Sequence, residues 1–217
     1  MKKTYTHVIW DYNGTILDDV RVGIDTINEM LAPRSMPTLD SVEAYQAVFD
    51  FPVTAYYQRL GFDFAKEDFQ SCLAPLWVSI NQRLLPNATL FEGVRPLTRA
   101  LRSKGIPQSI LTASEGSAVR EQLRARKALE WFDEIWGCDS IHAYGKEGVA
   151  RAWRNAHPDA VAVMLGDTTH DFAVAQEIGA DCILIAAGHH SRERLLTCGV
   201  PVVEDLSACA TLLLSDV

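Results

Sequence analysis

The sequence predicts an α/β protein: a doubly wound parallel sheet that is interrupted after its first strand by an all-helical insert. Two observations support this fold class. In the second half of the chain, short apolar runs alternate with helix-like segments, which is typical of parallel strands covered by helices on both faces. Between residues 20 and 87, aromatic and aliphatic residues instead recur at helical spacing, without the alternation of a strand.

The first strand is expected at residues 8–10, and the insert follows it. Helical spacing predicts four helices in the insert, at residues 20–31, 42–49, 53–60 and 69–84, and Gly61 stands where the third should end. We therefore expect residues 1–19 and 88–217 to form the α/β core and residues 20–87 to form a separate helical unit.

Strands and helices alternate through the rest of the chain. A helix is expected from Val94, with Gly105 just past its C-terminus. Further strands are expected at residues 108–111, near 135, and at 161–165, 182–185 and 202–203. Helices are expected at residues 115–129, 147–156, 171–178 and from about 206.

Composition limits the classes of function. A chain of 217 residues that is 48% hydrophobic can bury the core of one domain, with or without an insert. A formal charge of −8 without a run of Lys or Arg argues against nucleic acid and membrane surfaces as partners, and favours a small ligand. Scattered cysteines, no signal-like N-terminus and no apolar stretch of about 20 residues predict a cytoplasmic protein. The oligomeric state is not predicted by the sequence.

The stretch from His7 to Asp19 contains the first candidate site residues. Its apolar run ends in Asp11, and Asn13 stands two residues on, a spacing that points both side chains to the same side of an extended backbone. Gly14 then permits a sharp turn and a close approach of backbone N–H groups to a ligand. A carboxylate at the C-terminal end of a strand lies where open α/β sheets bind their ligands.

Asp167 and Asp171 add two further carboxylates, just after the expected strand 161–165. In a parallel sheet they would lie on the same edge as Asp11, where such groups repel by roughly 4 kcal/mol per pair at 4 Å and an effective dielectric of 20. A cation is therefore expected, and an all-oxygen site suits Mg²⁺. Alternatively, the two residues only cap the N-terminus of a helix.

Two further signals are weaker. Thr112 follows the expected strand 108–111 and precedes a helix, so that its hydroxyl and the next backbone N–H groups would hold an anion; an ordinary helix cap is the alternative. Lys146 stands at the entry of another helix, which is electrostatically unfavourable for a lysine. Binding of a negative group would explain that position, although a surface lysine remains the alternative.

In chain order, these residues resemble the four motifs of the haloacid dehalogenase (HAD) superfamily of phosphotransferases. The first motif of that superfamily is usually D-x-D-G-T followed by a further Asp. The matching residues are Asp11, Gly14, Thr15 and Asp18 for this motif, and then Thr112, Lys146 and the pair Asp167 and Asp171. The helical insert resembles the cap domain of the phosphoglycolate phosphatase-like branch, which implies a Rossmann-like HAD core. The resemblance extends from His7 to Val203.

The resemblance implies a Mg²⁺-dependent phosphatase acting on a small phosphorylated metabolite, a phosphate monoester. Asp11 would be the nucleophile, forming an aspartyl-phosphate that water then hydrolyses. The ion would be held by Asp11, by the main-chain carbonyl of Asn13 and by Asp167, with Asp171 in support. The groups implied to bind the phosphate are Asp11, Gly14, Thr112, the N–H of Ala113 and Lys146.

Asn13 stands where most phosphatases of the superfamily have a second aspartate, which protonates the leaving oxygen and later activates water. An amide can only hydrogen-bond, and general acid–base catalysis typically contributes about 10²–10⁴ in rate. We therefore expect a phosphatase that is slow or selective for leaving groups that need little protonation. A catalytically silent, phosphate-binding regulatory relative is the alternative.

Two other activities are less favoured. A phosphonate hydrolase would need a lysine in the cap, where only Lys66 occurs, beside Glu67 and Asp68. A dehalogenase needs no metal, which would leave the carboxylate pair without a purpose. His189 and His190 are expected to have surface or hydrogen-bonding roles on a loop at the sheet edge, and the aromatic residues of the insert are expected to form its core.

Overall fold

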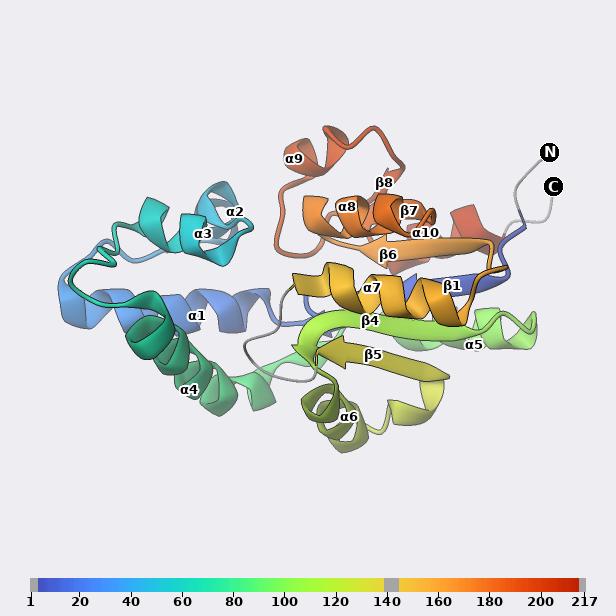
Figure 1. Cartoon of the computed structure of the whole chain (residues 1–217), viewed down its shortest axis with the longest axis horizontal. Helices are drawn as coiled ribbons and strands as arrows, with labels where there is room; N and C mark the ends of the chain where they lie inside the picture. Colours follow the sequence, from blue (N-terminus) through green and yellow to red (C-terminus); the bar gives the residue numbers. More distant parts are fainter. Residues whose placement is uncertain (1–3, 139–144, 215–217) are drawn as a thin grey trace.

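The computed structural model describes residues 4–138 and 145–214, and its α/β part is built on a sheet of six parallel strands (Figure 1). The strand order is β5-β4-β1-β6-β7-β8, so that β1 and β6 lie at the centre. The strands are β1 (His7–Trp10), β4 (Gln108–Glu115), β5 (Glu134–Cys138), β6 (Ala162–Gly166), β7 (Asp181–Ile185) and β8 (Val202–Val203). The parallel α/β fold predicted from the apolar runs is confirmed.

Helices cover both faces of the sheet. Successive side chains of each strand point to opposite sides, so that each strand contributes to two apolar clusters. On β1, Val8 and Trp10 contribute to one apolar cluster and Ile9 to the other, and all three are fully buried. The first cluster is closed by α5 (Val94–Ser103), α6 (Gly116–Ala125) and α10 (Leu206–Leu214). The second is closed by α7 (Gly145–Ala156), α8 (Thr169–Glu177) and α9 (Arg192–Leu196).

The helical insert packs around a core of its own and lies beyond the carboxyl ends of the strands, at the left in Figure 1. Its main helices are α1 (Val20–Leu31), α2 (Val42–Val48), α3 (Val53–Leu60) and α4 (Ala74–Leu84). The four apolar residues that predict α1 are buried in this core together with Tyr45, Tyr56 and Tyr57. Gly61 ends α3 with a positive φ of 98°, as its position suggests. Residues 69–73 form a π-helical turn ahead of α4, where the sequence predicts a single helix.

The chain crosses between the core and the insert at two short strands. They are β2 (Leu17–Asp18) and β3 (Thr89–Leu90), which pair antiparallel with each other. Each is only two residues long, so no apolar alternation marks it in the sequence. We propose that the cap spans residues 20–87, because the helices beyond this pair pack into the insert's own core.

The region from β4 to β5 differs from the prediction. β4 continues to Glu115, four residues beyond the predicted end, and its pairing with β5 shifts register between Leu111 and Glu115. α6 ends at Ala125 rather than at residue 129, because Lys127 adopts a positive φ of 56° and the next N–H bonds back to Leu123. Neither a glycine nor a proline marks this helix end in the sequence.

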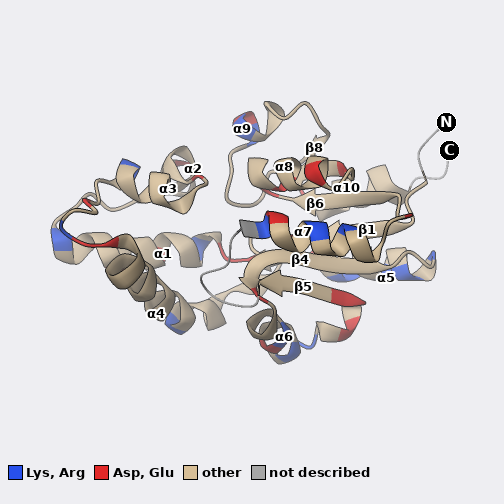
Figure 2. Ribbon diagram, viewed as in Figure 1, with Lys and Arg blue, Asp and Glu red and all other residues tan. Residues whose placement is uncertain are grey.

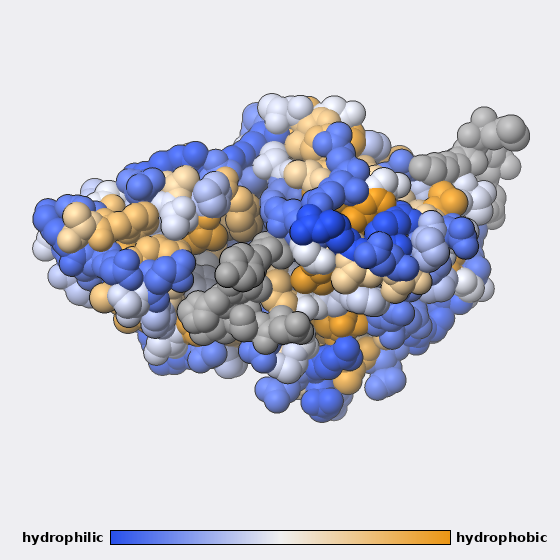
Figure 3. Space-filling view, in the orientation of Figure 1, coloured by the Kyte–Doolittle hydropathy of each residue, from blue (hydrophilic) through white to orange (hydrophobic). Residues whose placement is uncertain are grey.

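Along the ribbon in Figure 2, charged residues of both signs are dispersed over core and cap, and on the face shown in Figure 3 apolar patches are interrupted by hydrophilic residues. Among the described residues, no helix has the length and apolar character that crossing a bilayer requires. The predicted absence of nucleic-acid and membrane partners stays a prediction.

The central strand should be sensitive to small changes of volume. Replacing Ile9 by alanine is expected to lower the free energy of unfolding by about 2–5 kcal/mol, and replacing it by valine by about 0.5–1.5 kcal/mol, because the surrounding core cannot fill the cavity. Leu196 is 52% exposed, and its replacement by alanine should change stability by less than about 0.5 kcal/mol. Urea denaturation measures all three; equal losses at both positions would contradict the packing described.

Candidate active site

Four of the predicted residues meet at the carboxyl edge of the two central strands. Asp11 directly follows β1 and Asp167 directly follows β6, and the Asp11 N–H donates to Leu165 O at 2.8 Å. Asp171 lies in the first turn of α8 and Lys146 in the first turn of α7. Carboxylate oxygens of the three aspartates, one from each, all lie within 4.8 Å of one another. The parallel register of β1 and β6 therefore brings together residues that are far apart in sequence.

Lys146 is buried between two of these carboxylates. Its Nζ donates to Asp11 Oδ1 and, at 2.5 Å, to Asp171 Oδ1, and its side chain is 3% exposed. Burial lowers the pKa of the ammonium group, but the two carboxylates outweigh burial and the pKa of Lys146 is raised. The lysine is therefore held as a cation inside the site rather than at the surface.

Asp171 uses both carboxylate oxygens to organise the site. Oδ2 accepts hydrogen bonds from the N–H of Asp167 at 3.1 Å, the N–H of Thr168 at 2.9 Å and the hydroxyl of Thr168 at 2.7 Å. Thr168 and Asp171 thus form a capping box at the start of α8. Burial raises the pKa of Asp171, but Lys146 outweighs it and the pKa is lowered. The helix-cap alternative is thus observed together with the cluster, not in place of it.

Asp11 and Asp167 have the electrostatic environment of a cation site. Burial raises the pKa of Asp11 well above its usual value despite the nearby Lys146, and the other two carboxylates raise it further. Burial and Asp171 raise the pKa of Asp167 to about 6, against the lowering effect of His189. The carboxylate of Asp167 accepts from Thr15 Oγ1 at 3.0 Å and from His189 N at 2.7 Å. The ionised forms of these three buried carboxyl groups are unfavourable without a nearby cation beyond Lys146, and an all-oxygen donor set of this kind fits Mg²⁺.

Gly14 makes room for this arrangement. Its φ is +76°, and a Cβ at this position would lie 2.2 Å from Asp167 Oδ2. A side chain at position 14 would therefore displace the carboxylate as well as strain the backbone. The close approach of Asp167, from the fourth motif, therefore explains why position 14 in the first motif is a glycine.

Asn13 is held on both sides of its amide. Nδ2 donates to Asp19 Oδ2 at 2.7 Å, and Oδ1 accepts from Ser114 Oγ at 3.0 Å. Asp19 also accepts from the N–H of Gly14 at 2.9 Å. The resemblance matches Asp18 to the further Asp of the first motif, but Asp18 is exposed and Asp19 is buried in the site. In β2, Leu17 is buried and Asp18 points to solvent, and Asp19 follows the strand as the residue that precedes α1.

Thr112 and Ala113 lie within β4 and not at a helix N-terminus, so the predicted anion site of fresh helical N–H groups is wrong in its geometry. Thr112 is buried, and its Oγ1 accepts from the N–H of Ser114 at 3.1 Å. The pairing of Trp10 with Ile110 places Thr112 at the same edge as Asp11. The predicted role of Thr112 and Ala113 in phosphate binding stays a prediction.

His189 and His190 are buried, so the surface role allowed by the sequence is wrong and the hydrogen-bonded role is observed. His189 Nε2 lies 3.2 Å from Asp19 Oδ1, and its Nδ1 lies 2.9 Å from the hydroxyl of Tyr45 in the cap. Burial lowers the pKa of His189, but Asp19 and the neighbouring aspartates outweigh it and raise the pKa to about 9. His190 Nδ1 accepts from the N–H of Thr169 at 3.1 Å. Sequence reasoning did not connect His189 with Asp19 and Tyr45, because no local pattern marks a contact between three separate segments.

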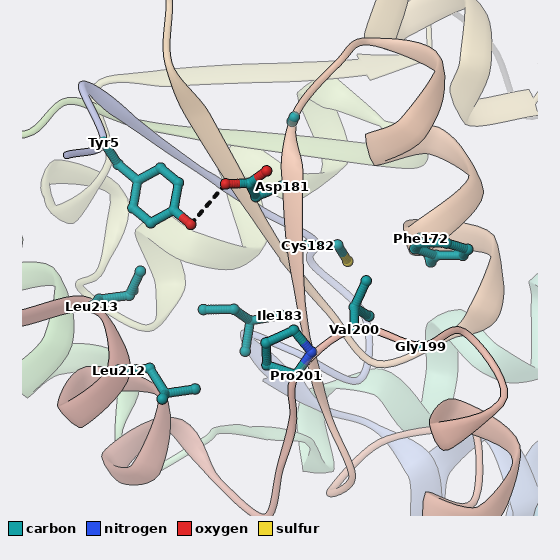
Figure 4. Close-up of a pocket in the computed structure, with 11 residues that line it drawn as sticks. Tyr5, Phe172, Asp181, Cys182, Ile183, Gly199, Val200, Pro201, Leu212 and Leu213 are labelled. Atoms are coloured by element: carbon teal, nitrogen blue, oxygen red, sulfur yellow. Dashed lines mark hydrogen bonds between the residues drawn. The ribbon is translucent and has the colours of Figure 1, made fainter. Parts of the chain in front are cut away.

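A hollow of about 450 Å³ lies elsewhere, at the start of β7 and beside α10 (Figure 4). Tyr5 donates to Asp181 at 2.8 Å on one side of it, and Ile183, Val200 and Leu213 give it apolar walls. It lies at the opposite end of the parallel strands from Asp11 and contains none of the clustered carboxylates.

Comparison with known proteins agrees with the geometry. Residues 8–185 match the family model of haloacid dehalogenase-like hydrolases. The chain belongs to this family, and its parallel sheet with helices on both faces is the α/β fold of that family.

Several relatives resemble the chain over most of its length. "Probable phosphatase IndB" of Dickeya dadantii is 25% identical over 204 residues, which cover 91% of this chain and 88% of that protein. The structure of Protein Tyrosine Kinase A (PtkA) from Mycobacterium tuberculosis is similar with a TM-score of 0.79 and 22% identity, covering 98% of this chain and all of that one. A structure described as a predicted phosphatase from Clostridium acetobutylicum has a TM-score of 0.77 and 19% identity, with 98% and 99% of the two chains covered.

Stability should depend on the protonation of His190. Burial and, next, the charge of Arg194 lower its pKa from 6.5 to about 4, although Asp50 and Asp171 act in the opposite direction. Because the unfolded chain binds this proton more tightly, the contribution is complete above about pH 6.5 and is lost as the pH falls towards 4, up to about 3 kcal/mol.

Replacing His190 by asparagine keeps a hydrogen-bond acceptor for Thr169 but removes the titration. Urea denaturation between pH 4.5 and 7.5 should give a shallower loss of stability on acidification in this variant than in the original protein. Parallel pH profiles for the two proteins would contradict the assignment.

Proposed function

We propose that the protein is a Mg²⁺-dependent phosphatase that hydrolyses a small phosphate monoester through an aspartyl-phosphate on Asp11. The observation that carries the proposal is the convergence of Asp11, Asp167 and Asp171 on one buried cluster, with Lys146 bonded to two of them. A family of hydrolases and a relative named a phosphatase, 25% identical, support the reaction class.

The contacts support a proposed role for each of these residues. Lys146 holds one oxygen of Asp11 and orients its carboxylate for attack on phosphorus, which breaks the bond to the leaving oxygen. Attack of water on the aspartyl-phosphate then releases inorganic phosphate and restores the carboxylate. Thr112, Gly14 and the N–H of Ala113 are proposed to bind the phosphoryl oxygens with Lys146.

The metal would be held by Asp11, Asp167 and the main-chain carbonyl of Asn13. Asp171 is proposed to support the site from outside, because both of its oxygens already accept hydrogen bonds from Lys146, Thr168 and the N–H of Asp167. When bound, Mg²⁺ supplies positive charge that stabilises the transferring phosphoryl group. The substrate is proposed to be a small phosphorylated metabolite; a structurally similar protein of Rhodobacter sphaeroides, 18% identical, is described in complex with xylulose-(1,5)bisphosphate.

Asn13 sets the expected level of activity. Its amide is already engaged by Asp19 and Ser114, and it has no proton to transfer. We therefore propose turnover that is slow for alkyl phosphates and faster for aryl phosphates, whose leaving groups need little protonation. The cytoplasmic location stays a prediction from the sequence.

A catalytically silent, phosphate-binding relative is the alternative proposal, and the environment of Asn13 is the observation that favours it. A phosphonate hydrolase is not favoured, because the side chain of Lys66 is 82% exposed and forms an ion pair with Asp63 at 3.3 Å. A dehalogenase is not favoured either, since the buried carboxylate cluster would then have no cation to bind.

The first test replaces Asp11 by asparagine. Turnover of an aryl phosphate in the presence of Mg²⁺ should fall to the background level, because the nucleophile is lost, and EDTA should abolish turnover by the original protein. Phosphate release measures both, over a panel of phosphate esters. Equal rates for the two proteins across the panel would support the silent alternative instead.

The second test replaces Asn13 by aspartate. The new carboxyl group would lie beside Asp19, at the place of a 2.7 Å contact, so that the two groups would share a proton available for the leaving oxygen. Turnover should rise several-fold or more, and more for an alkyl than for an aryl phosphate. Asn155, which is exposed on α7, gives the control with the same change of charge when it is replaced by aspartate. A gain that is no larger than in this control would show that another group already supplies the proton.

A further inference from the structure

The loop that follows β7 is packed against helix α2 of the cap. Gln46 donates from Nε2 to the carbonyl of Gly188 at 2.7 Å, and the ring of Phe49 lies 5.2 Å from that of His189. Arg194, just beyond the loop, donates to Phe49 O at 2.8 Å and pairs with Asp50. The cap therefore rests on the same loop that donates a backbone N–H to Asp167.

A continuous chain of hydrogen bonds runs from this contact into the site. The Tyr45 hydroxyl lies 2.9 Å from His189 Nδ1, and His189 Nε2 lies 3.2 Å from Asp19 Oδ1. Asp19 Oδ2 accepts from Asn13 Nδ2 at 2.7 Å, and Asn13 Oδ1 accepts from Ser114 Oγ at 3.0 Å. One side chain of the cap is thereby linked to the residue two positions after Asp11.

The direction of the bonds is fixed at the centre of the chain. An ionised carboxylate only accepts, so both Nε2 of His189 and Nδ2 of Asn13 donate to Asp19. Tyr45, His189 and Asp19 are 3%, 8% and 6% exposed, which leaves little access for water to replace a missing partner. One partner of the Asn13 amide, Asp19, is thus linked to the cap, and the other, Ser114, lies on β4 of the core.

Packing alone does not account for the hydroxyl of Tyr45. Tyr56 belongs to the same apolar core of the cap and is equally buried, yet its hydroxyl has no hydrogen-bond partner among the described residues. The ring of Tyr45 packs in the same way, stacked 5.1 Å from Phe49, but its hydroxyl reaches out of the cap to His189. The two tyrosines are therefore a matched pair that differ in this bond.

We propose that Tyr45 is a positioning residue of the active site: with the cap resting on the core, its hydroxyl fixes His189 and, through Asp19, the orientation of the Asn13 amide beside Asp11. The geometric part of this inference is independent of the reaction. Its kinetic part rests on the proposed phosphatase function. Loss of the hydroxyl should weaken the hold on His189 and Asp19, and so on Asn13 Nδ2, while the bond from Ser114 to Asn13 Oδ1 and the carboxylates proposed to bind the metal and phosphate stay in place.

The geometric part is tested by NMR of the side-chain amide of Asn13, assigned as the signal that is missing from an Asn13→Ala variant. Tyr45→Phe should shift or broaden this signal, and Tyr56→Phe should leave it in place. His189→Asn breaks the next bond of the chain and should have the same effect as Tyr45→Phe, which keeps the test valid if either variant fails to fold. Urea denaturation verifies that each variant is folded.

The kinetic part is tested with an aryl phosphate and Mg²⁺. Tyr45→Phe should lower kcat roughly five-fold, the usual effect of one lost hydrogen bond, with KM changed by less than about two-fold. In the Asn13→Ala background the same substitution should have no further effect on kcat, because the group that it positions is absent.

The outcomes separate the two proposals. A shifted amide signal without turnover in any variant would support the positioning and overturn the phosphatase function. Turnover that depends on Asp11, with an Asn13 signal that moves no more in Tyr45→Phe than in Tyr56→Phe, would support the function and overturn the positioning. A full effect of Tyr45→Phe on kcat in the Asn13→Ala background would also overturn it, since Tyr45 would then act on another group.

Discussion

The buried contact of Lys146 with Asp11 and Asp171 is the interaction on which the rest of the site depends. It joins the end of β1 to the first turns of α7 and α8, three segments that no continuous stretch of sequence connects. A buried ion pair of this kind gives little net stability, because the lost hydration offsets much of the attraction. Its effect is on geometry, since neither carboxylate can turn away without leaving a charge unpaired.

The carboxylates beside this lysine are themselves organised by backbone groups. Asp171 caps α8 and binds the N–H of Asp167, while Asp167 binds the N–H of His189. Such bonds orient the side chains before any ligand arrives, so that little reorganisation remains to be done on binding. The site is therefore formed largely by the strand ends and helix starts of the α/β core, and the cap adds contacts from one side.

The α/β core was predictable from the sequence because apolar runs of strand length and helical spacing are local signals. Asp11 and Asp167 were predictable because each stands at the end of such a run, and Asp171 because it stands four residues beyond Asp167 at the start of a helix. The extended β4 was not, since Thr112 to Glu115 are polar or small and their pairing with β5 depends on a register shift. The sequence also did not show that Asp19, rather than Asp18, lies in the site, because this depends on which side of the two-residue strand β2 faces the core. The burial of His189 depends on the cap, which lies more than a hundred residues away in the chain.

The pairing of β2 with β3 has a consequence for motion. It joins the only two described stretches of chain that pass between core and cap. Any rotation of the cap relative to the core would therefore take place about this strand pair. Asp19 directly follows β2, and its carboxylate is linked through His189 to the hydroxyl of Tyr45 in the cap. A rotation of the cap about this strand pair would therefore change the surroundings of the Asp19 carboxylate in two ways, through the adjoining backbone of β2 and through the contact of His189 with Tyr45.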